Sequence, residues 1–362
     1  MKTSKIGVAV CGATGSVGQR FIELLQGHPW FELKCIMASE KSEGKKYSEA
    51  VQWIVSPRIP EPVKDMEIKP VSIESLKGED IQIVFSALPA DVAGPVEEQF
   101  AKAGYAVSSN ASAHRRDPDV PILIPEVNAE HIKLIPVQRK NRKWSGLIVT
   151  EANCTTTGLV IALKPIYERF GIEKVIVTTM QALSGAGLPG VPSMAIIDNV
   201  IPYIANEEEK VEWETLKLLG EFKEDKIIPA KIKVSASCNR VFVLDGHLET
   251  VLVETSTPAS VEDVKKVLSE FKGEPQRLNL PTAPKNPIIV LNEVNRPQPR
   301  FDRWAGEPER AKGMAVTVGR IRKDTVFEKG IKMVVLSHNT IRGAAGESIL
   351  NAELLVANKI VQ

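Results

Sequence analysis

Three closely spaced glycines near the N-terminus constrain the fold of this chain more than any other feature. Residues 5–11 form a short apolar run typical of a buried strand, and residues 17–25 have the spacing of an amphipathic helix. The segment between them reads Gly-Ala-Thr-Gly-Ser-Val-Gly over residues 12–18. Glycine permits a tight turn and close approach of the backbone to a ligand, and the following helix offers its first N–H groups to a phosphate. We therefore expect a dinucleotide site here; the alternative is an ordinary strand–helix turn.

The first 150 residues continue this alternation of strands and helices. Further strands are predicted at 31–37, 81–86 and 106–108, and a helix at 95–104 ends in a glycine. Strands that alternate with helices are typical of a parallel sheet with helical crossovers. The predicted fold class is therefore α/β, with a Rossmann-type nucleotide-binding domain over residues 1–152.

The second part of the chain has a different pattern. Strands are predicted at 175–179, 232–236, 241–244 and 250–254, and helices at 207–219 and 260–271. This mixture favours an α+β domain over residues 153–338, with a mixed or antiparallel sheet and helices on one face. The last segment, 343–360, is strongly helical and opens on Gly-Ala-Ala-Gly, which allows close packing.

Composition and charge exclude several classes of protein. The chain has 46 Lys and Arg residues against 45 Asp and Glu residues, a net charge of +1, so we expect no nucleic-acid partner. No uncharged apolar run reaches the roughly 18 residues of a membrane helix. The four cysteines are too irregularly spaced for a disulfide framework or a metal-binding pair. They indicate reduced thiols in a cytoplasmic protein without a metal.

Cys154 differs from the other three cysteines. It follows a predicted strand, has small and polar neighbours, and leads into an apolar helix over 159–166. The positive end of a helix dipole lowers the pKa of a thiol and favours the thiolate. We therefore expect Cys154 to be a nucleophile, and Cys11, Cys35 and Cys238 to be small buried side chains.

Five histidines could supply a base for this thiol. His28, in a predicted surface turn, and His131, on a polar helix, do not suggest chemistry. His247 is a better candidate because Gly246 precedes it and it lies between the strands predicted at 241–244 and 250–254. A structural role for His247 is the alternative, and His338 is the next candidate base.

The residues after the second predicted strand bear on the choice of cofactor. NAD sites usually place a lone acidic residue here, on the ribose hydroxyls. This chain has Ser39-Glu40-Lys41-Ser42, whose hydroxyls and cation suit a 2′-phosphate. NADP(H) is the expected cofactor, and Glu40 is the argument for NAD.

Sequence motifs along the whole chain resemble those of one family. They lie at 12–18, 108–115, 120–128, 153–155, 180–187, 191–193, 206–210, 235–240, 245–247, 318–320 and 338–346. Among them are Asn153-Cys154-Thr155 and the glutamate-rich run that ends at Lys210. Together they resemble the aspartate-β-semialdehyde dehydrogenases of archaeal and fungal type over essentially the full length.

This resemblance implies a role for each candidate site residue. Cys154 would be the nucleophile, His247 the general acid/base and Gln181 the residue that orients the acyl group. Arg240 would hold the substrate carboxylate, and Glu207 its amino group. The phosphate pocket would be formed by Lys210, Arg115 and Asn110. The cofactor would contact Gly12, Thr14, Gly15, Ser16, Val17, Ser39, Ser42, Ser86 and Asn339.

The resemblance also implies a reaction and an assembly. The reaction would be the NADPH-dependent reductive dephosphorylation of L-β-aspartyl phosphate to L-aspartate-β-semialdehyde through a cysteine thioacyl intermediate. It would serve the biosynthesis of lysine, threonine, methionine and isoleucine. A C-terminal helix within 339–362 would complete the nucleotide domain, and the protein would be a homodimer or homotetramer. The substrate carries a phosphate, a carboxylate and an ammonium group, so two cationic groups and one anionic group suit it.

Two other functions fit the same scaffold. A CoA-thioester reductase of the malonyl-CoA reductase type would not need Glu207 for an amino group. A non-catalytic NADP-binding redox sensor would leave Cys154, Gln181 and His247 unused. One departure from the family pattern is Glu151, since many members have a proline near this position. A carboxylate there would oppose thiolate formation, so we expect Glu151 to point away or to pair with a cation.

Overall fold

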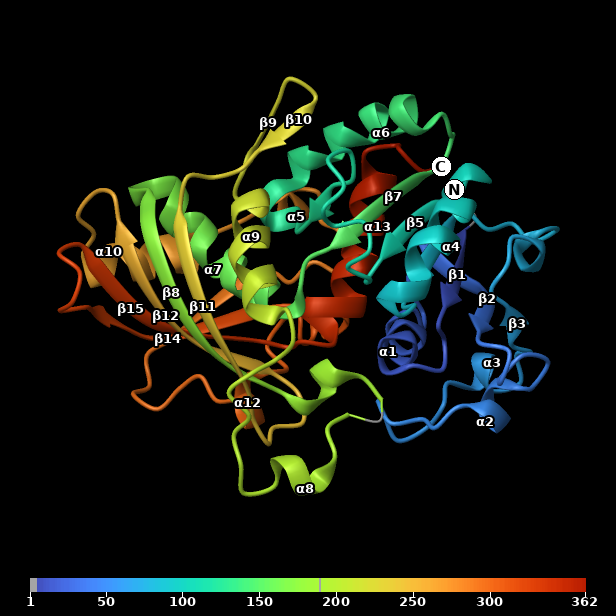
Figure 1. Cartoon of the computed structure of the whole chain (residues 1–362), viewed down its shortest axis with the longest axis horizontal. Helices are drawn as coiled ribbons and strands as arrows, with labels where there is room; N and C mark the ends of the chain where they lie inside the picture. The colour runs from blue at the N-terminus through green and yellow to red at the C-terminus, as the bar shows by residue number, and fades with distance from the viewer. Residues whose placement is uncertain (1–4, 189) are drawn as a thin grey trace.

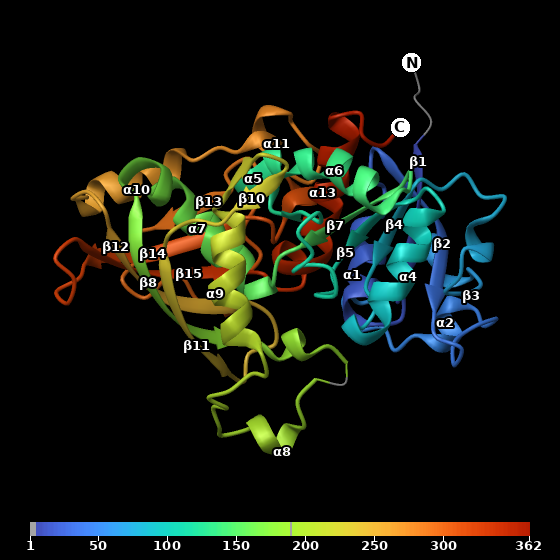
Figure 2. The same ribbon diagram turned by 45° about the horizontal axis from the view of Figure 1, so that its top comes forward.

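The chain folds into two large sheets that lie side by side, with helices around and between them (Figure 1). The computed structural model describes residues 5–188 and 190–362. Within these two stretches, no helix combines the length and the apolar character needed to cross a membrane. Figure 2 shows the same two sheets turned by 45° about the horizontal axis, with the C-terminal helix between them.

The N-terminal sheet has seven strands, and all of its strand pairs are parallel. In spatial order they are β3 (Lys69–Pro70), β2 (Phe31–Ala38), β1 (Ile6–Cys11), β4 (Ile83–Ser86), β5 (Ala106–Ser109), β7 (Leu147–Glu151) and β6 (Ile122–Leu123). Chain order reverses between β1 and β4, which creates a crevice outside the carboxyl ends of these strands. The glycine segment follows β1 directly and therefore lies at this crevice.

Helices cover both faces of this sheet. Alternate residues of β1 face opposite sides, so Val8 and Val10 share a core cluster with Phe21, whereas Ala9 shares one with Phe100. Phe21 belongs to α1 (Ser16–Leu24) and Phe100 to α4 (Ala90–Lys102). The remaining short elements are α2 (Tyr47–Ala50), α3 (Glu61–Lys64), η1 (Glu74–Leu76), α5 (Pro125–Asn128), η2 (Ala129–Lys133) and α6 (Leu134–Arg142).

The second sheet is mixed and has six strands. In spatial order they are β11 (Lys233–Arg240), β8 (Ile172–Gln181), β12 (His247–Thr255), β15 (Gly330–Ser337), β14 (Val316–Lys323) and β13 (Ile288–Leu291). The two outer pairs, β11 with β8 and β13 with β14, are parallel, and the inner pairs are antiparallel. Connecting elements are η3 (Leu183–Ala186), α8 (Ser193–Ile196), β9 (Glu221–Lys223), β10 (Lys226–Ile228), α11 (Glu274–Arg277), α12 (Pro299–Asp302) and η4 (Glu309–Ala311).

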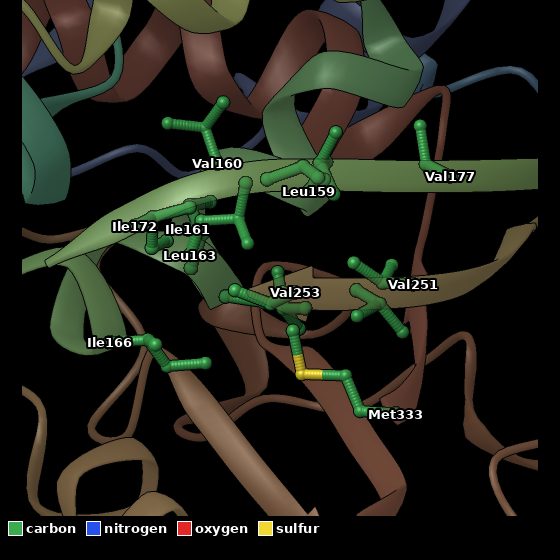
Figure 3. Close-up of a cluster of buried hydrophobic side chains, with 14 of the residues drawn as sticks. Leu159, Val160, Ile161, Leu163, Ile166, Ile172, Val177, Val251, Val253 and Met333 are labelled. Atoms are coloured by element: carbon green, nitrogen blue, oxygen red, sulfur yellow. The ribbon is translucent and has the colours of Figure 1, made fainter. Parts of the chain in front are cut away.

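One face of this sheet packs on three helices, α7 (Cys154–Phe170), α9 (Glu207–Leu218) and α10 (Val261–Glu270). Figure 3 shows side chains of α7, such as Leu159 and Ile161, with Val251 and Met333 of the strands. Successive side chains of a strand point to opposite faces of the sheet. Along the whole length of β12, buried residues therefore alternate with half-buried ones on the other face. The sheet thus buries one face against the helix that starts at Cys154.

The C-terminal segment returns to the first sheet. After β15 the chain forms a π-helical turn, η5 (Ile341–Ala345), and then α13 (Gly346–Ala357). α13 packs on β5, β7 and α1, while η5 contacts both α1 and α7. A Cβ at Gly343 would lie 2.8 Å from the Cα of Cys154, so this glycine is required for the close approach of the two segments.

The structure corrects several predicted elements. Residues 241–244 are not a strand, because β11 and its partner β8 end together at Arg240 and Gln181 and no further strand remains to pair with. His247 is consequently the first residue of β12 itself, and not part of a loop that joins two strands. The helix predicted at 95–104 begins at Ala90 and continues through Pro95, since a proline in the second turn removes only one backbone hydrogen bond.

The environments of two histidines also differ from the prediction. His28 is fully buried: its Nδ1 accepts the N–H groups of Trp30 and Phe31, and its Nε2 lies 2.8 Å from Glu353 Oε1 on α13. His131 is buried as well, between Asn128 and the carbonyl of Gly220. A buried imidazole needs hydrogen-bond partners for its nitrogens. Because one partner of each ring comes from a distant part of the chain, both rings link separate segments.

Candidate active site

Cys154 is the first residue of α7, at the junction of the two sheets. Asn153 caps the helix, and its Oδ1 accepts the N–H groups of Thr155 and Thr156 at 3.0 and 3.2 Å. The other three cysteines are buried, as expected, whereas Cys154 is half-exposed. It lines a cavity of about 410 Å³ together with residues of both domains.

His247 lies beside the thiol. The distance between Cys154 Sγ and His247 Nε2 is 3.2 Å, although 93 positions separate the two residues in the chain. The start of β12 and the start of α7 therefore bring the thiol and the imidazole within the distance expected for a cysteine–histidine pair. His338, the next candidate base, is buried and stacks edge-on against Trp304.

The electrostatics of the thiol differ from the expectation. Burial raises the pKa of Cys154 to about 12, and the carboxylate of Glu207 adds to this, against the opposing effect of Arg115 and Arg240. The net direction of the pKa shift is therefore opposite to the one expected from the helix position alone. Burial and the cation of Arg240 lower the pKa of His247 to about 3. Both members of the pair are therefore neutral at pH 7.

Glu207 organises the amide side chains around the thiol. Its Oε1 accepts hydrogen bonds from Gln181 Nε2 at 2.9 Å and from Asn153 Nδ2 at 2.8 Å. Thr179 in turn donates to Gln181 Oε1 at 3.1 Å. Gln181 ends β8 and Glu207 begins α9, so the ends of two elements place the amide and the carboxylate together.

Arg240 lies next to Gln181 because the two residues pair at the end of the β11–β8 ladder. Its Nη1 donates to the carbonyl of Ala182 at 2.6 Å. A Cβ at Gly185 would lie 2.8 Å from the same nitrogen, so the loop after β8 passes close to the guanidinium. Arg240 is 6% exposed, and the planar fork of a guanidinium suits a carboxylate.

The three residues expected to bind the phosphate, Asn110, Arg115 and Lys210, line the cavity at Cys154. Arg115 Nη2 donates to the carbonyl of Asn110, and Lys210 Nζ lies 3.9 Å from Glu207 Oε2. Arg115 is 5% exposed, and its Nη1 donates to Glu214 Oε1 at 2.9 Å. The structure thus brings two cations and one amide to the cavity at Cys154.

Glu214 is a site residue that the sequence analysis missed. It is fully buried, and its second oxygen accepts the backbone N–H of Asn153 at 2.6 Å. It therefore bridges Arg115 and the cap of the nucleophile's helix. Its position two turns after Glu207 on the same helix face was the available signal.

Glu151 is buried beside this cluster, where Ser348 donates to its Oε2 at 3.1 Å. Burial raises the pKa of Glu151 well above its ordinary value, although the nearby cation of Arg115 opposes this. A raised pKa favours the neutral carboxyl, which opposes a thiolate less than a carboxylate does. The cation expected beside Glu151 is that of Arg115.

A second cavity, of about 720 Å³, lies at the glycine segment. Of the residues expected at the cofactor, Gly12, Thr14, Gly15 and Ser39 line it, and Ser16, Val17 and Asn339 line the cavity at Cys154. Ser42 lines neither cavity, and Ser86 is 1% exposed beneath the loop. The two cavities share Leu88 and Pro89, so a long ligand can extend from the end of β2 to the thiol.

Sequence reasoning missed the apolar wall of the second cavity. It is formed by Pro70, Val71, Leu88, Val92 and Val96. A flat apolar wall beside a glycine turn suits a purine ring. The available signal was the pair Val92 and Val96, which lie one turn apart on α4 with Val92 exposed.

A parallel domain with a glycine turn lies next to a mixed sheet with a cysteine–histidine contact, and the two cavities between these features share lining residues. This is the architecture of a two-domain dehydrogenase. Residues 7–135 match the family model for the semialdehyde dehydrogenase NAD binding domain, and residues 163–342 match that for the semialdehyde dehydrogenase dimerisation domain. The chain belongs to the semialdehyde dehydrogenase family. Across residues 5–188 and 190–362, no cluster of three metal-binding side chains is present.

Curated relatives match over nearly the full length. The aspartate-semialdehyde dehydrogenase of Archaeoglobus fulgidus is 56% identical over 98% of this chain and 99% of its own, and that of Saccharomyces cerevisiae is 48% identical over 97% and 98%. The malonyl CoA reductase (NADP) of Metallosphaera sedula is 45% identical over 96% of each chain.

Solved structures agree with the fold. The aspartate semialdehyde dehydrogenase of Candida albicans with NADP has a TM-score of 0.88 at 45% identity, covering 98% of this chain and 99% of its own. The type II enzyme of Vibrio cholerae, complexed with ASA, has a TM-score of 0.76 at 30% identity over the same shares. The expected family and the expected fold class are both confirmed.

Proposed function

We propose that this chain is an NADP-dependent aspartate-semialdehyde dehydrogenase that converts L-β-aspartyl phosphate into L-aspartate-β-semialdehyde in amino-acid biosynthesis. The observation that carries the proposal is the contact of 3.2 Å between Cys154 Sγ and His247 Nε2, beside a cavity that Cys154 lines together with Arg115, Lys210 and Glu207. Two cationic groups and a carboxylate around one nucleophile match a substrate with a phosphate, a carboxylate and an ammonium group.

The residues at the glycine segment fit a dinucleotide. Gly12 has a φ of +75°, and a Cβ at Gly18 would lie 2.1 Å from the carbonyl oxygen of Gly12, so only glycines permit this turn. The backbone of the glycine segment and the N-terminus of α1 would hold the pyrophosphate, and Ser39 and Lys41 would hold the 2′-phosphate. When bound, NADPH supplies the hydride.

The protein's own residues perform the remaining steps. The sulfur of Cys154 forms a bond to the acyl carbon, phosphate leaves, and the thioester remains on the enzyme. Arg240 holds the α-carboxylate with its planar fork, and Glu207 accepts hydrogen bonds from the ammonium group. Lys210, Arg115 and Asn110 bind the phosphate before and after it leaves. His247, 3.2 Å from the sulfur, acts on it either as a proton acceptor or as a hydrogen-bond donor.

The test is the reverse reaction with purified protein. Aspartate semialdehyde, phosphate and NADP should produce NADPH, measured by its absorbance, and omission of phosphate should stop the reaction after at most one turnover. Absence of NADPH formation with all three present would refute the proposal.

The Cys154→Ala variant is the first prediction from this mechanism. It should lose activity by about a thousandfold or more, because no covalent intermediate can form. NADP affinity should be nearly unchanged, because the cofactor residues belong to the other domain. Titration of NADP by calorimetry provides the control, and substantial residual turnover would argue against the covalent mechanism.

A CoA-thioester reductase is the second candidate, because a malonyl CoA reductase is among the relatives at 45% identity. The position of Glu207, 7% exposed beside Gln181 and Lys210, favours a substrate with an ammonium group. Malonyl-CoA with NADPH is the discriminating assay. A kcat/KM for malonyl-CoA above that for aspartyl phosphate would reverse the assignment.

The outer face of the six-stranded sheet supports a proposal for the assembly. This face carries Ile176, Met180, Leu248 and Leu252, and Ile176 is 43% exposed. The semialdehyde dehydrogenase dimerisation domain covers these strands. The protein is a homodimer through this face, or a homotetramer built from two such dimers, and it acts in the cytoplasm.

A further inference from the structure

The backbone of Ala182 contacts two side chains of the active site. Ala182 follows the last residue of β8 with φ −66° and ψ 155°. Its N–H donates to His247 Nδ1 at 3.0 Å, and its carbonyl accepts from Arg240 Nη1 at 2.6 Å. One residue of the backbone therefore holds both the histidine and the proposed carboxylate-binding arginine.

The direction of the hydrogen bond to His247 is fixed by chemistry. A backbone N–H can only donate, so Nδ1 of the ring must present its lone pair. A neutral imidazole carries one N–H, which is then on Nε2, 3.2 Å from Cys154 Sγ. An imidazolium would place a second N–H against the N–H of Ala182, which is unfavourable in a buried site.

The groups around the ring disfavour the imidazolium further. His247 is fully buried, and it faces the guanidinium of Arg240 from β11 and the thiol of Cys154 from α7. Glu207 on α9 forms its hydrogen bonds to Asn153 and Gln181, not to the ring. Glu249 lies on the same strand, and burial raises the pKa of its carboxyl well above the ordinary value. No carboxylate among the described residues therefore pairs with the ring.

We propose that the Ala182 amide locks His247 in its Nε2–H form, so that the histidine donates a hydrogen bond to the Cys154 sulfur and does not take the thiol proton. Ala182 is in this sense a positioning residue. The proposal narrows the acid/base role given above and rests on the proposed function for its chemical consequence, but the locked tautomer is a property of the resting protein.

The proton balance of the reaction permits this role. When the thiol attacks the acyl phosphate dianion, the S–C bond forms, the C–O bond to phosphate breaks, and the thiol proton passes to a phosphoryl oxygen, so that HPO₄²⁻ leaves. After hydride reduction of the thioester, the C–S bond breaks and its electron pair returns to sulfur. The Nε2–H group of His247 then stabilises the departing thiolate, which regains a proton from solvent.

The loop that carries Ala182 is braced against movement. The N–H groups of Leu183 and Ser184 donate to the carbonyls of Val243 and Leu244, just before His247. Asn339 joins the same two segments, because its Oδ1 accepts the N–H of Gly246 and its Nδ2 donates to Ser184, both at 2.8 Å. The amide and the ring are thereby held in one geometry from both sides, as a tautomer lock requires.

The direct test is ¹⁵N NMR of the histidine rings in the resting protein without substrate. At pH 7 the His247 resonances should show a protonated Nε2 and an unprotonated Nδ1, and they should stay so down to about pH 5. The signals are assigned by their loss in the His247→Gln variant. A protonated Nδ1, or a doubly protonated ring at pH 7, would overturn the proposal, whether or not the protein reduces aspartyl phosphate.

The matched variants are Ala182→Pro and Ala182→Gly. The φ of −66° suits proline, and Gln181 before it ends an extended strand, so proline can replace Ala182 without a change of backbone conformation. Its Cδ takes the place of the amide hydrogen, so the ring loses the N–H and moves away from this position. In Ala182→Pro the Nδ1 resonance should move towards the protonated position, whereas Ala182→Gly, which keeps the N–H, should leave it unchanged. An unaltered tautomer in a folded Ala182→Pro protein would show that Ala182 is not the lock.

A kinetic pair separates a donor from a base. Gln at position 247 can place its Nε2–H group near the position of the histidine Nε2 but cannot take a proton, and Ala can do neither. If His247 is a donor, kcat of His247→Gln should exceed that of His247→Ala by about tenfold, with similar KM for the semialdehyde. Equal kcat values for the two variants would indicate a base.

Discussion

The charge balance around one sulfur decides how this site can begin its reaction. Cys154 has the helix position of an activated thiol, yet its pKa is raised to about 12, with burial the main cause and the carboxylate of Glu207 the second. Arg115 and Arg240 act in the opposite direction but do not prevail. The resting thiol is thus protected from oxidation and alkylation, because only the thiolate reacts.

The Glu207→Gln variant tests this balance. Removal of a negative charge lowers the pKa of a nearby acid, so the thiolate fraction at a given pH below that pKa should increase. The rate of Cys154 alkylation by iodoacetamide at pH 8 should rise, by about tenfold for each unit of pKa decrease. Glu209→Gln is the matched control, since Glu209 is exposed on the same helix and pairs with Arg116. An equal rate in both variants would contradict the assignment.

At the scale of elements, α9 has the largest influence on the site. Its first turn supplies Glu207 and Lys210, and Glu214, two turns further on, joins Arg115 to the N–H of Asn153. One helix therefore sets the carboxylate beside the thiol, a cation for the phosphate and the cap of α7. A shift of α9 would displace all three together.

Glu214→Gln is predicted to impair phosphate binding. Gln still accepts the N–H of Asn153 but cannot pair with the Arg115 cation, so the guanidinium loses its orientation. Loss of one partner of a buried ion pair should cost about 3 kcal/mol of stability, and KM for phosphate should rise about tenfold, about 1.4 kcal/mol, with a smaller change for the semialdehyde. Glu212→Gln is the control, because Glu212 lies on the same helix and its side chain accepts the N–H of Ala236 on β11. An unchanged KM for phosphate would remove Glu214 from the site.

Local patterns predicted some of these elements well and others badly. β1, α1 and β4 are close to their predicted bounds, because a buried parallel strand is a continuous apolar run and glycines mark its end. The Val-Phe-Val sequence at 241–243 has high strand propensity, yet no partner strand exists beyond Arg240, so tertiary context overrides it. Strands β13 to β15 were not predicted at all.

The candidate active site, too, could be predicted only in part from local sequence patterns. The cysteine could be singled out locally, because its neighbours and its place before a helix are visible in the sequence. Its pairing with His247, 93 positions away, depends on where β12 meets α7, and only the family resemblance indicated it. The roles of Glu214 and the Ala182 backbone depend on contacts between elements, which no local pattern encodes.

At the scale of the whole molecule, the outer face of the six-stranded sheet should decide the assembly. Ile176→Asp places a charge in the middle of this face without touching the cleft, because the side chain points away from α7. Light scattering after gel filtration should show a shift from the dimer mass towards that of a single chain. Thr325→Asp, in the turn before β15, is the control on a different surface, and an unchanged mass for Ile176→Asp would exclude this face as the interface.

Glu249 offers a test of how a buried acid affects the stability of the whole fold. It lies on β12 two residues after His247 and is fully buried, and neither of its carboxyl oxygens has a hydrogen-bond partner among the described residues. Burial raises its pKa well above the ordinary 4.5. In the unfolded chain the same carboxyl ionises above pH 4.5, so the folded state holds the extra proton and stability falls as pH rises.

Glu249→Gln removes this dependence while keeping the shape of the side chain. The variant should gain stability relative to the parent as pH rises from 5 towards the folded pKa, by up to about 1.4 kcal/mol per pH unit. Thermal unfolding at pH 5 and pH 8 should therefore show a larger gain in Tm at pH 8. Glu254→Gln is the control on the same strand, where the carboxylate pairs with Lys174 at 2.6 Å and its loss should not stabilise the fold. An equal Tm difference between Glu249→Gln and the parent at both pH values would show that Glu249 is ionised in the folded protein, contrary to the prediction.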